Sequence, residues 1–161
     1  MRVSAIPAGY HSVTPYLFIS GADAAIAFYI EAFGAEEVMR LPSPDGLVMH
    51  AEIRVGDSHI MLADAMEDAG VHSPDTLGGV ASSLMLYVDD VDAVYQRAVD
   101  AGATEMRPIE DQFWGDRMGT VIDPFGHQWS IATHVEDVDD EEMQRRFTAM
   151  MDDMGGAAYA A

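Results

Sequence analysis

The 161-residue chain contains no cysteine and no lysine. The lack of cysteine excludes disulfides, thiolate zinc sites and cysteine nucleophiles. The lack of lysine excludes Schiff-base chemistry on a lysine amine. The sequence also has no glycine-rich phosphate loop and no Gly-x-Ser-x-Gly nucleophile elbow, so several large enzyme classes are removed at the start.

Long hydrophobic runs are missing as well. No segment approaches the roughly 18 consecutive apolar residues of a membrane span, and the N-terminus lacks a basic region followed by an apolar run. We therefore expect no membrane partner and a cytoplasmic location. The hydrophobic share is nevertheless 49%, which is enough for the core of one ordinary domain or of two small units.

Positive charge is scarce, because 8 arginines stand against 28 acidic residues and the formal net charge is -20. Such a balance opposes binding to nucleic acid or to anionic membranes, whose phosphates need cations. The acidic surface has two interpretations, adaptation to high salt or a composition bias that favours solubility. Neither interpretation identifies a ligand.

One pattern occurs twice along the chain. Each copy has a β-rich segment, then a helix with apolar residues at i, i+3, i+4 and i+7, then a Gly-Ala pair and three short strands. Gly34 and Gly102 close the two helices at an offset of 68 residues (102 − 34). The helix stripes are Ile26, Tyr29, Ile30 and Phe33 in the first copy and Val91, Val94, Tyr95 and Ala98 in the second.

The sequence thus predicts an α+β protein built as a tandem βαβββ repeat with a C-terminal helix. We predict a single domain over residues 1–161. Its parts are a first unit at 12–63, a connector or lid at 64–81, a second unit at 82–134 and a helical tail at 135–161. Asp23 is the expected N-cap of the first helix and Asp89 or Asp90 that of the second. Met143, Phe147, Met150 and Met154 form an apolar stripe in the tail.

The last hairpin turn reads Asp123-Pro124-Phe125-Gly126-His127. Together with the two βαβββ copies, it makes residues 12–134 resemble the vicinal oxygen chelate superfamily, in its glyoxalase and bleomycin-resistance branch. The resemblance implies a homodimer, and metal ligands at positions matched here by Thr14, Met61, Ser83 and Ser130. Divalent metals favour imidazole and carboxylate rather than hydroxyl or thioether, so we expect no metal site and no other cofactor.

Strand alternation selects the candidate ligand-binding residues. His50 and Glu52 share one strand face, where they form a rim pair, bind a ligand, or act as acid and base. Trp114, Asp116 and Arg117 precede the last hairpin, where Trp114 either stacks on a ligand or is a buried anchor beside an Asp-Arg pair. The remaining candidates are Met61, Tyr87 and His134. Trp129 is expected in the core, and His11, His59, His72 and His127 at the surface or in turns.

These features predict metal-independent binding of a small aromatic or cationic molecule in a cavity between the units. The alternative is an enzyme of the superfamily, a lyase, isomerase or dioxygenase, with a non-standard site around His50, Glu52 and His134. A third hypothesis is a structural or regulatory dimer without a ligand.

Overall fold

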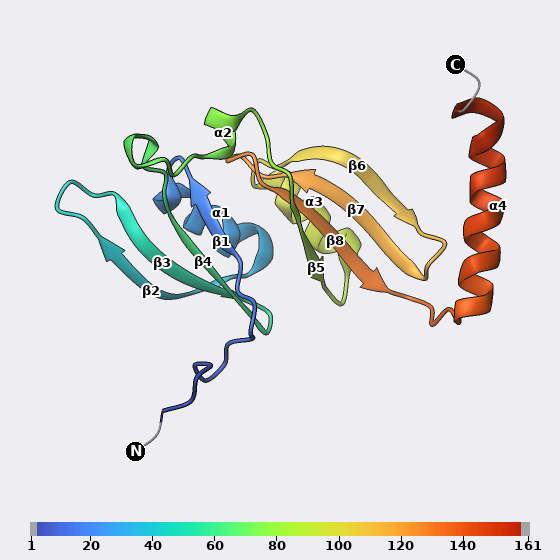
Figure 1. Cartoon of the computed structure of the whole chain (residues 1–161), viewed down its shortest axis with the longest axis horizontal. Helices are drawn as coiled ribbons and strands as arrows, with labels where there is room; N and C mark the ends of the chain where they lie inside the picture. The colour runs from blue at the N-terminus through green and yellow to red at the C-terminus, as the bar shows by residue number, and fades with distance from the viewer. Residues whose placement is uncertain (1–2, 159–161) are drawn as a thin grey trace.

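The computed structural model describes residues 3–158, with side chains to Asp153. Two βαβββ units fill most of it, and the predicted repeat is confirmed (Figure 1). The first unit comprises β1 (Tyr16–Ile19), α1 (Ala22–Phe33), β2 (Glu36–Pro42), β3 (Val48–Val55) and β4 (Ser58–Asp64). The second comprises β5 (Ser83–Tyr87), α3 (Val91–Asp100), β6 (Thr104–Asp111), β7 (Asp116–Ile122) and β8 (Gln128–His134).

Each unit forms its own sheet, in the orders β1-β4-β3-β2 and β5-β8-β7-β6. Tyr16 lies opposite Met61 in the first sheet, as Met85 lies opposite Ser130 in the second. Both pairs are offset by 69 residues (85 − 16 and 130 − 61), which gives the same alignment of the repeat as the sequence did. In Figure 1 the two sheets lie side by side with α1 and α3 behind them, so one face of each sheet is left without a helix.

The connector is more ordered than its composition suggested. It contains a short 3-10 helix, η1 (Glu67–Ala69), and one helical turn, α2 (Pro74–Leu77). The carboxylate of Glu67 organises it, because Oε1 accepts the Thr76 hydroxyl at 2.6 Å and Oε2 contacts His72. His72 therefore lies in the connector, where the sequence placed it.

The N-terminus of α1 is not capped by Asp23, and that prediction is wrong. Asp64, at the end of β4, accepts the backbone N–H groups of Gly21 at 3.0 Å and Ala22 at 2.9 Å, while Asp23 pairs with Arg40. A cap far along the chain leaves no signal in the local sequence, whereas Asp90 caps α3 locally as predicted, through the Ala93 N–H at 3.0 Å.

The core lies between the sheets and the two helices. Ile26, Tyr29 and Phe33 are buried as expected, but Ile30 is 44% exposed, so it does not belong to the buried stripe. Met49 of β3 is also 45% exposed. A pairing irregularity between Leu41 and Pro42 falls beside it and interrupts the strand alternation there.

The two units are joined by buried polar contacts. The Asp123 carboxylate accepts the Tyr29 hydroxyl of α1 at 2.7 Å and the indole N–H of Trp129 at 3.0 Å. Trp129, 2% exposed as expected for a core residue, packs its ring 4.6 Å from that of Phe33. His127, predicted at the surface or in a turn, lies in the turn but is buried, with Nε2 3.2 Å from the Phe18 carbonyl oxygen. These contacts fix the relative position of the sheets.

The tail helix α4 (Asp140–Ala158) stands at the rim of the second sheet (Figure 1). Phe147 meets Phe113 with ring centroids 5.8 Å apart yet remains 42% exposed. Arg146 ties the helix down through Glu136 and the Phe113 carbonyl oxygen. Helix α4 is therefore held to the second unit on one side. Met154, the last residue of the predicted apolar stripe, lies outside the described side chains. None of the described helices is long and apolar enough to cross a membrane.

Candidate functional site

A cavity of about 830 Å³ lies between the facing edges of β1 and β5. Thr14, Tyr16, Ser83, Met85 and Tyr87 contribute to its walls, and Trp129 lies at its base in the core. The β3–β4 turn adds a further wall with His59. This size suits a small organic molecule, and the mixture of aromatic, methionine and hydroxyl groups is typical of a small-molecule pocket.

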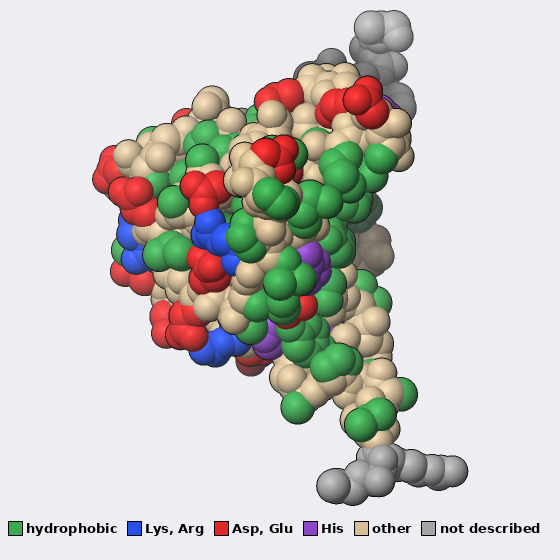
Figure 2. All heavy atoms as spheres, turned by 90° about the vertical axis from the view of Figure 1, so that its left-hand side faces the viewer, with side chains coloured by type: hydrophobic (Ala, Val, Ile, Leu, Met, Phe, Trp, Pro, Cys, Tyr) green, Lys and Arg blue, Asp and Glu red, His purple; other side chains and the backbone are tan. Residues whose placement is uncertain are grey.

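The cavity opens on the sheet face that the helices leave uncovered. Tyr16, Met85 and Tyr87 on that face are 40%, 49% and 59% exposed. Figure 2 shows the molecule from the end of the first unit, with hydrophobic side chains and histidines on the side of this face and many of the acidic side chains in this view away from it. The uncovered sheet face is thus a partly apolar surface around the cavity.

His50 and Glu52 belong to a polar cluster on the first sheet. Nδ1 of His50 lies 2.8 Å from the Tyr16 hydroxyl, and Nε2 lies 3.1 Å from Glu52 Oε1. The Tyr10 hydroxyl donates to the other oxygen of Glu52. Met61 is half-buried and pairs with Tyr16 on one side and Glu52 on the other, so it forms the floor between them.

A second polar cluster surrounds Asp116 on the second sheet. This residue is 3% exposed, and its carboxylate accepts the Tyr87 hydroxyl at 2.9 Å, the Trp114 indole N–H at 3.0 Å and His134 Nδ1 at 2.8 Å. Nε2 of His134 faces Asp137 at 3.0 Å. Trp114 is thus an anchor in the cluster, the structural one of the two roles that the sequence offered.

Electrostatics in this second cluster favour the ionised forms. Desolvation alone raises the pKa of Asp116, but hydrogen bonds from His134, Tyr87 and Trp114 outweigh it and lower the pKa. Hydrogen bonding to Asp116, and then to Asp137, raises the pKa of His134. Since both ring nitrogens face carboxylate oxygens, both bonds require the imidazolium.

Arg117 does not join Asp116. Adjacent strand residues point to opposite faces, so Arg117 lies on the helix side and pairs with Asp92 at 2.8 Å and Asp111 at 3.1 Å. The Asp-Arg pair that the sequence offered as a loop brace is not formed between these two residues in the described structure. Hydrogen bonds from Arg117 lower the pKa of Asp92, which is the mark of a surface ion pair.

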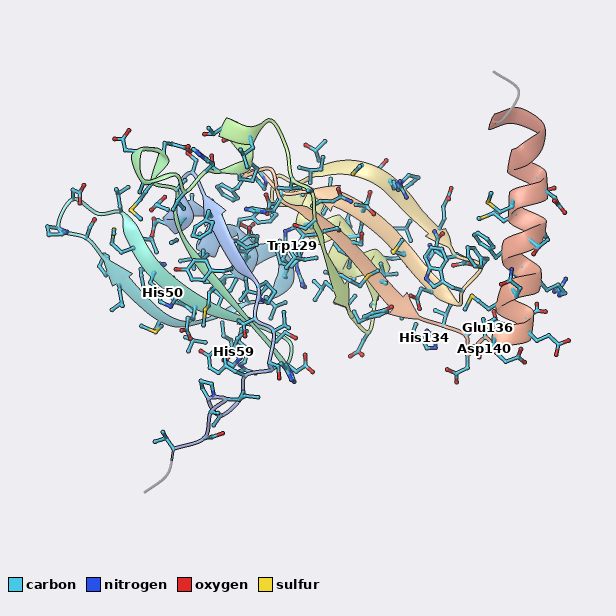
Figure 3. The ribbon with its side chains drawn as sticks, viewed as in Figure 1. His50, His59, Trp129, His134, Glu136 and Asp140 are labelled. Carbon is cyan, nitrogen blue, oxygen red and sulfur yellow. The ribbon has the colours of Figure 1, made fainter. Side chains whose placement is uncertain are left out.

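The two polar clusters do not meet within one chain. Figure 3 shows His50 on the first sheet and His134 at the end of β8 in the second, on opposite sides of Trp129. The combined site around His50, Glu52 and His134 is therefore not assembled by a single chain. Of the eight predicted ligand-binding residues, Tyr87 lines the cavity; the other seven lie in the two clusters or, for Arg117, behind the sheet.

Two of the four positions that match metal ligands in the resemblance, Ser83 and Ser130, lie in contact through their hydroxyl groups. Ser130 Oγ lies 3.3 Å from Ser83 Oγ and 3.3 Å from Thr120 Oγ1. Among the residues that the structure describes, no group of three or more His, Cys, Asp and Glu side chains is arranged to hold a metal. The hydroxyl and thioether groups at the matched positions are not the imidazole and carboxylate donors that divalent metals favour.

His59 and Tyr10 are the residues that sequence reasoning missed. His59 was expected at the surface, but it is half-buried, lines the cavity and stacks on Tyr10. A signal was present, because His59 lies two residues before Met61 and so on the same strand face. Tyr10 gave none, since its contacts come from an irregular lead-in.

These observations define a class, the tandem βαβββ proteins with a pocket between the units. The model of the Glyoxalase/Bleomycin resistance protein/Dioxygenase superfamily matches residues 9–131, and the chain belongs to this family. An uncharacterized protein of Mycobacterium bovis is 42% identical over 144 residues, which cover 88% of this chain and 95% of that protein.

Two solved structures illustrate the family. TioX from Micromonospora sp. ML1 superposes with a TM-score of 0.61 at 26% identity, over 78% of this chain and 99% of TioX. A glyoxalase-related enzyme from Fulvimarina pelagi superposes with a TM-score of 0.61 at 27% identity, over 76% of this chain and 87% of the enzyme. The fold predicted from the sequence is confirmed by both.

Proposed function

We propose that the chain binds a small aromatic or cationic molecule in the cavity between its two units, without a metal or another cofactor. The observation that carries this proposal is the cavity of about 830 Å³ with Tyr16, Tyr87 and Trp129 in its walls. Aromatic faces attract planar and cationic groups, while the hydroxyls of Thr14 and Ser83 supply hydrogen bonds.

We further propose that the binding form is a homodimer. The uncovered sheet face carries four exposed apolar or aromatic side chains, those of Tyr16, Phe18, Met85 and Tyr87. Contiguous exposed apolar patches mark sites of protein–protein contact. A second copy laid over this face would bury it and deepen the cavity. Sedimentation at micromolar concentration should show a dimer, and a monomer alone would contradict this part of the proposal.

An enzyme of the family with a site around His50, Glu52 and His134 is the alternative. No contact in the described structure favours it, because His134 is engaged by Asp116 and Asp137 away from the other two residues. Metal analysis of protein purified without chelator separates the two hypotheses. Stoichiometric metal that is lost on His50→Ala would support the enzyme and contradict metal-independent binding.

A thermal-shift screen of planar cationic and neutral aromatic compounds tests the binding proposal, since a ligand of the folded state raises the midpoint of unfolding. Ser83→Phe would fill the cavity and should abolish the shift. Gln144→Phe, on the exposed side of α4, is the matched control and should leave the shift unchanged. If no compound shifts the midpoint, the third hypothesis, a dimer without a ligand, is favoured.

A further inference from the structure

The N-terminal segment lies against the polar cluster of the first sheet. We call residues 7–15 the arm. Its Tyr10 ring stacks on the imidazole of His59, with centroids 4.1 Å apart and planes 19° from parallel. The Tyr10 hydroxyl reaches Glu52 on the neighbouring strand. A β-carbon on Gly9 would lie 3.4 Å from Cε1 of His59, so the arm runs close over that ring.

The arm covers the His59 ring but forms no hydrogen bond with its Nδ1 atom. Nδ1 of His59 is buried and has no hydrogen-bond partner within the described residues. Leaving such a buried polar group unpaired is unfavourable, because the group has given up its hydrogen bonds to water. With the arm in place, His59 Nδ1 therefore stays available for a hydrogen bond with another occupant of the position that Tyr10 holds.

The Tyr10 contact is continuous with the cavity. His59 lines the cavity wall and also forms the floor beneath Tyr10. His11 and Thr14, further along the arm, line the same cavity. Displacement of the arm would thus join the cavity to the Glu52 carboxylate, which is 12% exposed under the present cover.

We propose that Tyr10 is an internal occupant of a ligand subsite formed by His59 and Glu52, and that the arm must be displaced for this subsite to be filled. The Tyr10 phenol indicates which ligands the subsite would select. They are planar aromatic rings that stack on the His59 imidazole and direct a hydrogen-bond donor at the Glu52 carboxylate. This inference rests on the proposed function and narrows its ligand class to planar aromatics that carry an N–H or O–H donor.

A cationic donor fits the subsite better than the neutral phenol. Glu52 is shielded from solvent, and hydrogen bonds between a charged donor and a carboxylate are about twice as strong as neutral ones. The remaining partner of Glu52 is His50, which stays in place when Tyr10 leaves. A protonated amino-aromatic ligand would therefore outcompete the arm, whereas an aromatic hydrocarbon would not.

The experiment compares proflavine binding, followed by its fluorescence, in the wild type and in Tyr10→Ala. Proflavine is planar, cationic and carries amino donors. Removal of the competing ring should lower its dissociation constant at least fivefold, and Glu52→Gln in the Tyr10→Ala background should reverse the gain. Ser12→Ala, at an exposed position of the arm outside the cavity lining, should have no effect. Equal affinity in the wild type and in folded Tyr10→Ala would overturn the inference.

A second measurement needs no variant. Hydrogen exchange of the amides at residues 7–15 in the wild type should speed up when proflavine is added, because the arm is displaced; unchanged or slower exchange contradicts the inference.

Ser83→Phe separates the arm proposal from the proposed function. If it abolishes proflavine binding while Tyr10→Ala changes nothing, the cavity proposal stands and the arm proposal fails. If Tyr10→Ala tightens binding both with and without Ser83→Phe, the arm proposal stands and the cavity proposal fails.

Discussion

The two units share one fold but use its equivalent positions differently. Asp64 and Thr133 occupy the same place in the repeat (133 − 64 is 69), and each accepts an N–H at the start of its own unit's helix, Ala22 at 2.9 Å and Val91 at 2.9 Å. The first unit uses a buried carboxylate there and the second a hydroxyl.

The turns between the last two strands differ more. The first unit has the exposed pair Gly56-Asp57, whereas the second has a turn built on buried Asp123 that reaches across to Tyr29. The second unit therefore uses this turn for the joint between the units, whereas in the first unit the corresponding turn lines the cavity. A repeat can divide support and binding between its copies in this way.

The largest expected effect is at that joint. Asp123→Ala removes the acceptor of the buried Tyr29 hydroxyl and Trp129 indole N–H, and each unpaired donor costs about 1–3 kcal/mol. We expect the free energy of unfolding, measured by urea denaturation, to fall by about 4 kcal/mol.

Asp57→Ala, in the corresponding exposed turn of the first unit, is the control and should change stability by less than about 0.5 kcal/mol. Similar losses for the two variants would remove the distinction between a supporting turn and a cavity-lining turn.

The helix N-termini give the next effect. Asp64 also accepts the N–H of Val48 at 2.7 Å, so Asp64→Ala leaves three backbone donors without their acceptor. We expect a loss of about 3 kcal/mol, against about 1 kcal/mol for Thr133→Val. Chemical denaturation of both variants checks the ratio, and a Thr133→Val loss equal to that of Asp64→Ala would contradict it.

A smaller, pH-dependent effect is expected at the second cluster. Because Asp116 and Asp137 raise the pKa of His134, its stabilising contribution is complete below its ordinary value of about 6.5 and is lost as pH rises through the raised value. Stability should therefore fall across this range in the wild type, with a shallower slope in His134→Gln. NMR titration of the His134 ring measures the pKa directly; a value at or below 6.5 would contradict the network.

The smallest effect is expected for Arg117→Ala. Its ion pairs with Asp92 and Asp111 are exposed, and pairs of this kind contribute little to stability. Ligand affinity should not change, since Arg117 lies on the helix side. An affinity loss comparable to that of Ser83→Phe would show that Arg117 belongs to the site after all.

Much of the fold could be predicted because its signals are local. The helix stripes, Gly34 and the Asp123–His127 turn place the repeat, and strand alternation put Tyr87 on the face that lines the cavity. The parts that could not be predicted depend on contacts between distant segments.

The site shows this limit clearly. Asp64 caps a helix that starts more than 40 residues earlier, with a sequence separation of 42 to Ala22. Tyr10 reaches Glu52 across a sequence separation of 42 as well. His50 and His134 were grouped by residue type although the predicted repeat places them in different units, because sequence alone does not give the distance between them.

The most direct test of ligand binding between the units uses the two tryptophans of the chain. Trp114→Phe leaves Trp129, which lies at the base of the cavity, as the tryptophan that reports on it. Titration with proflavine should quench Trp129 emission saturably at one ligand per chain, and adding Ser83→Phe should remove the quenching. Emission that falls linearly without saturation, or quenching unchanged by Ser83→Phe, would contradict binding in this cavity.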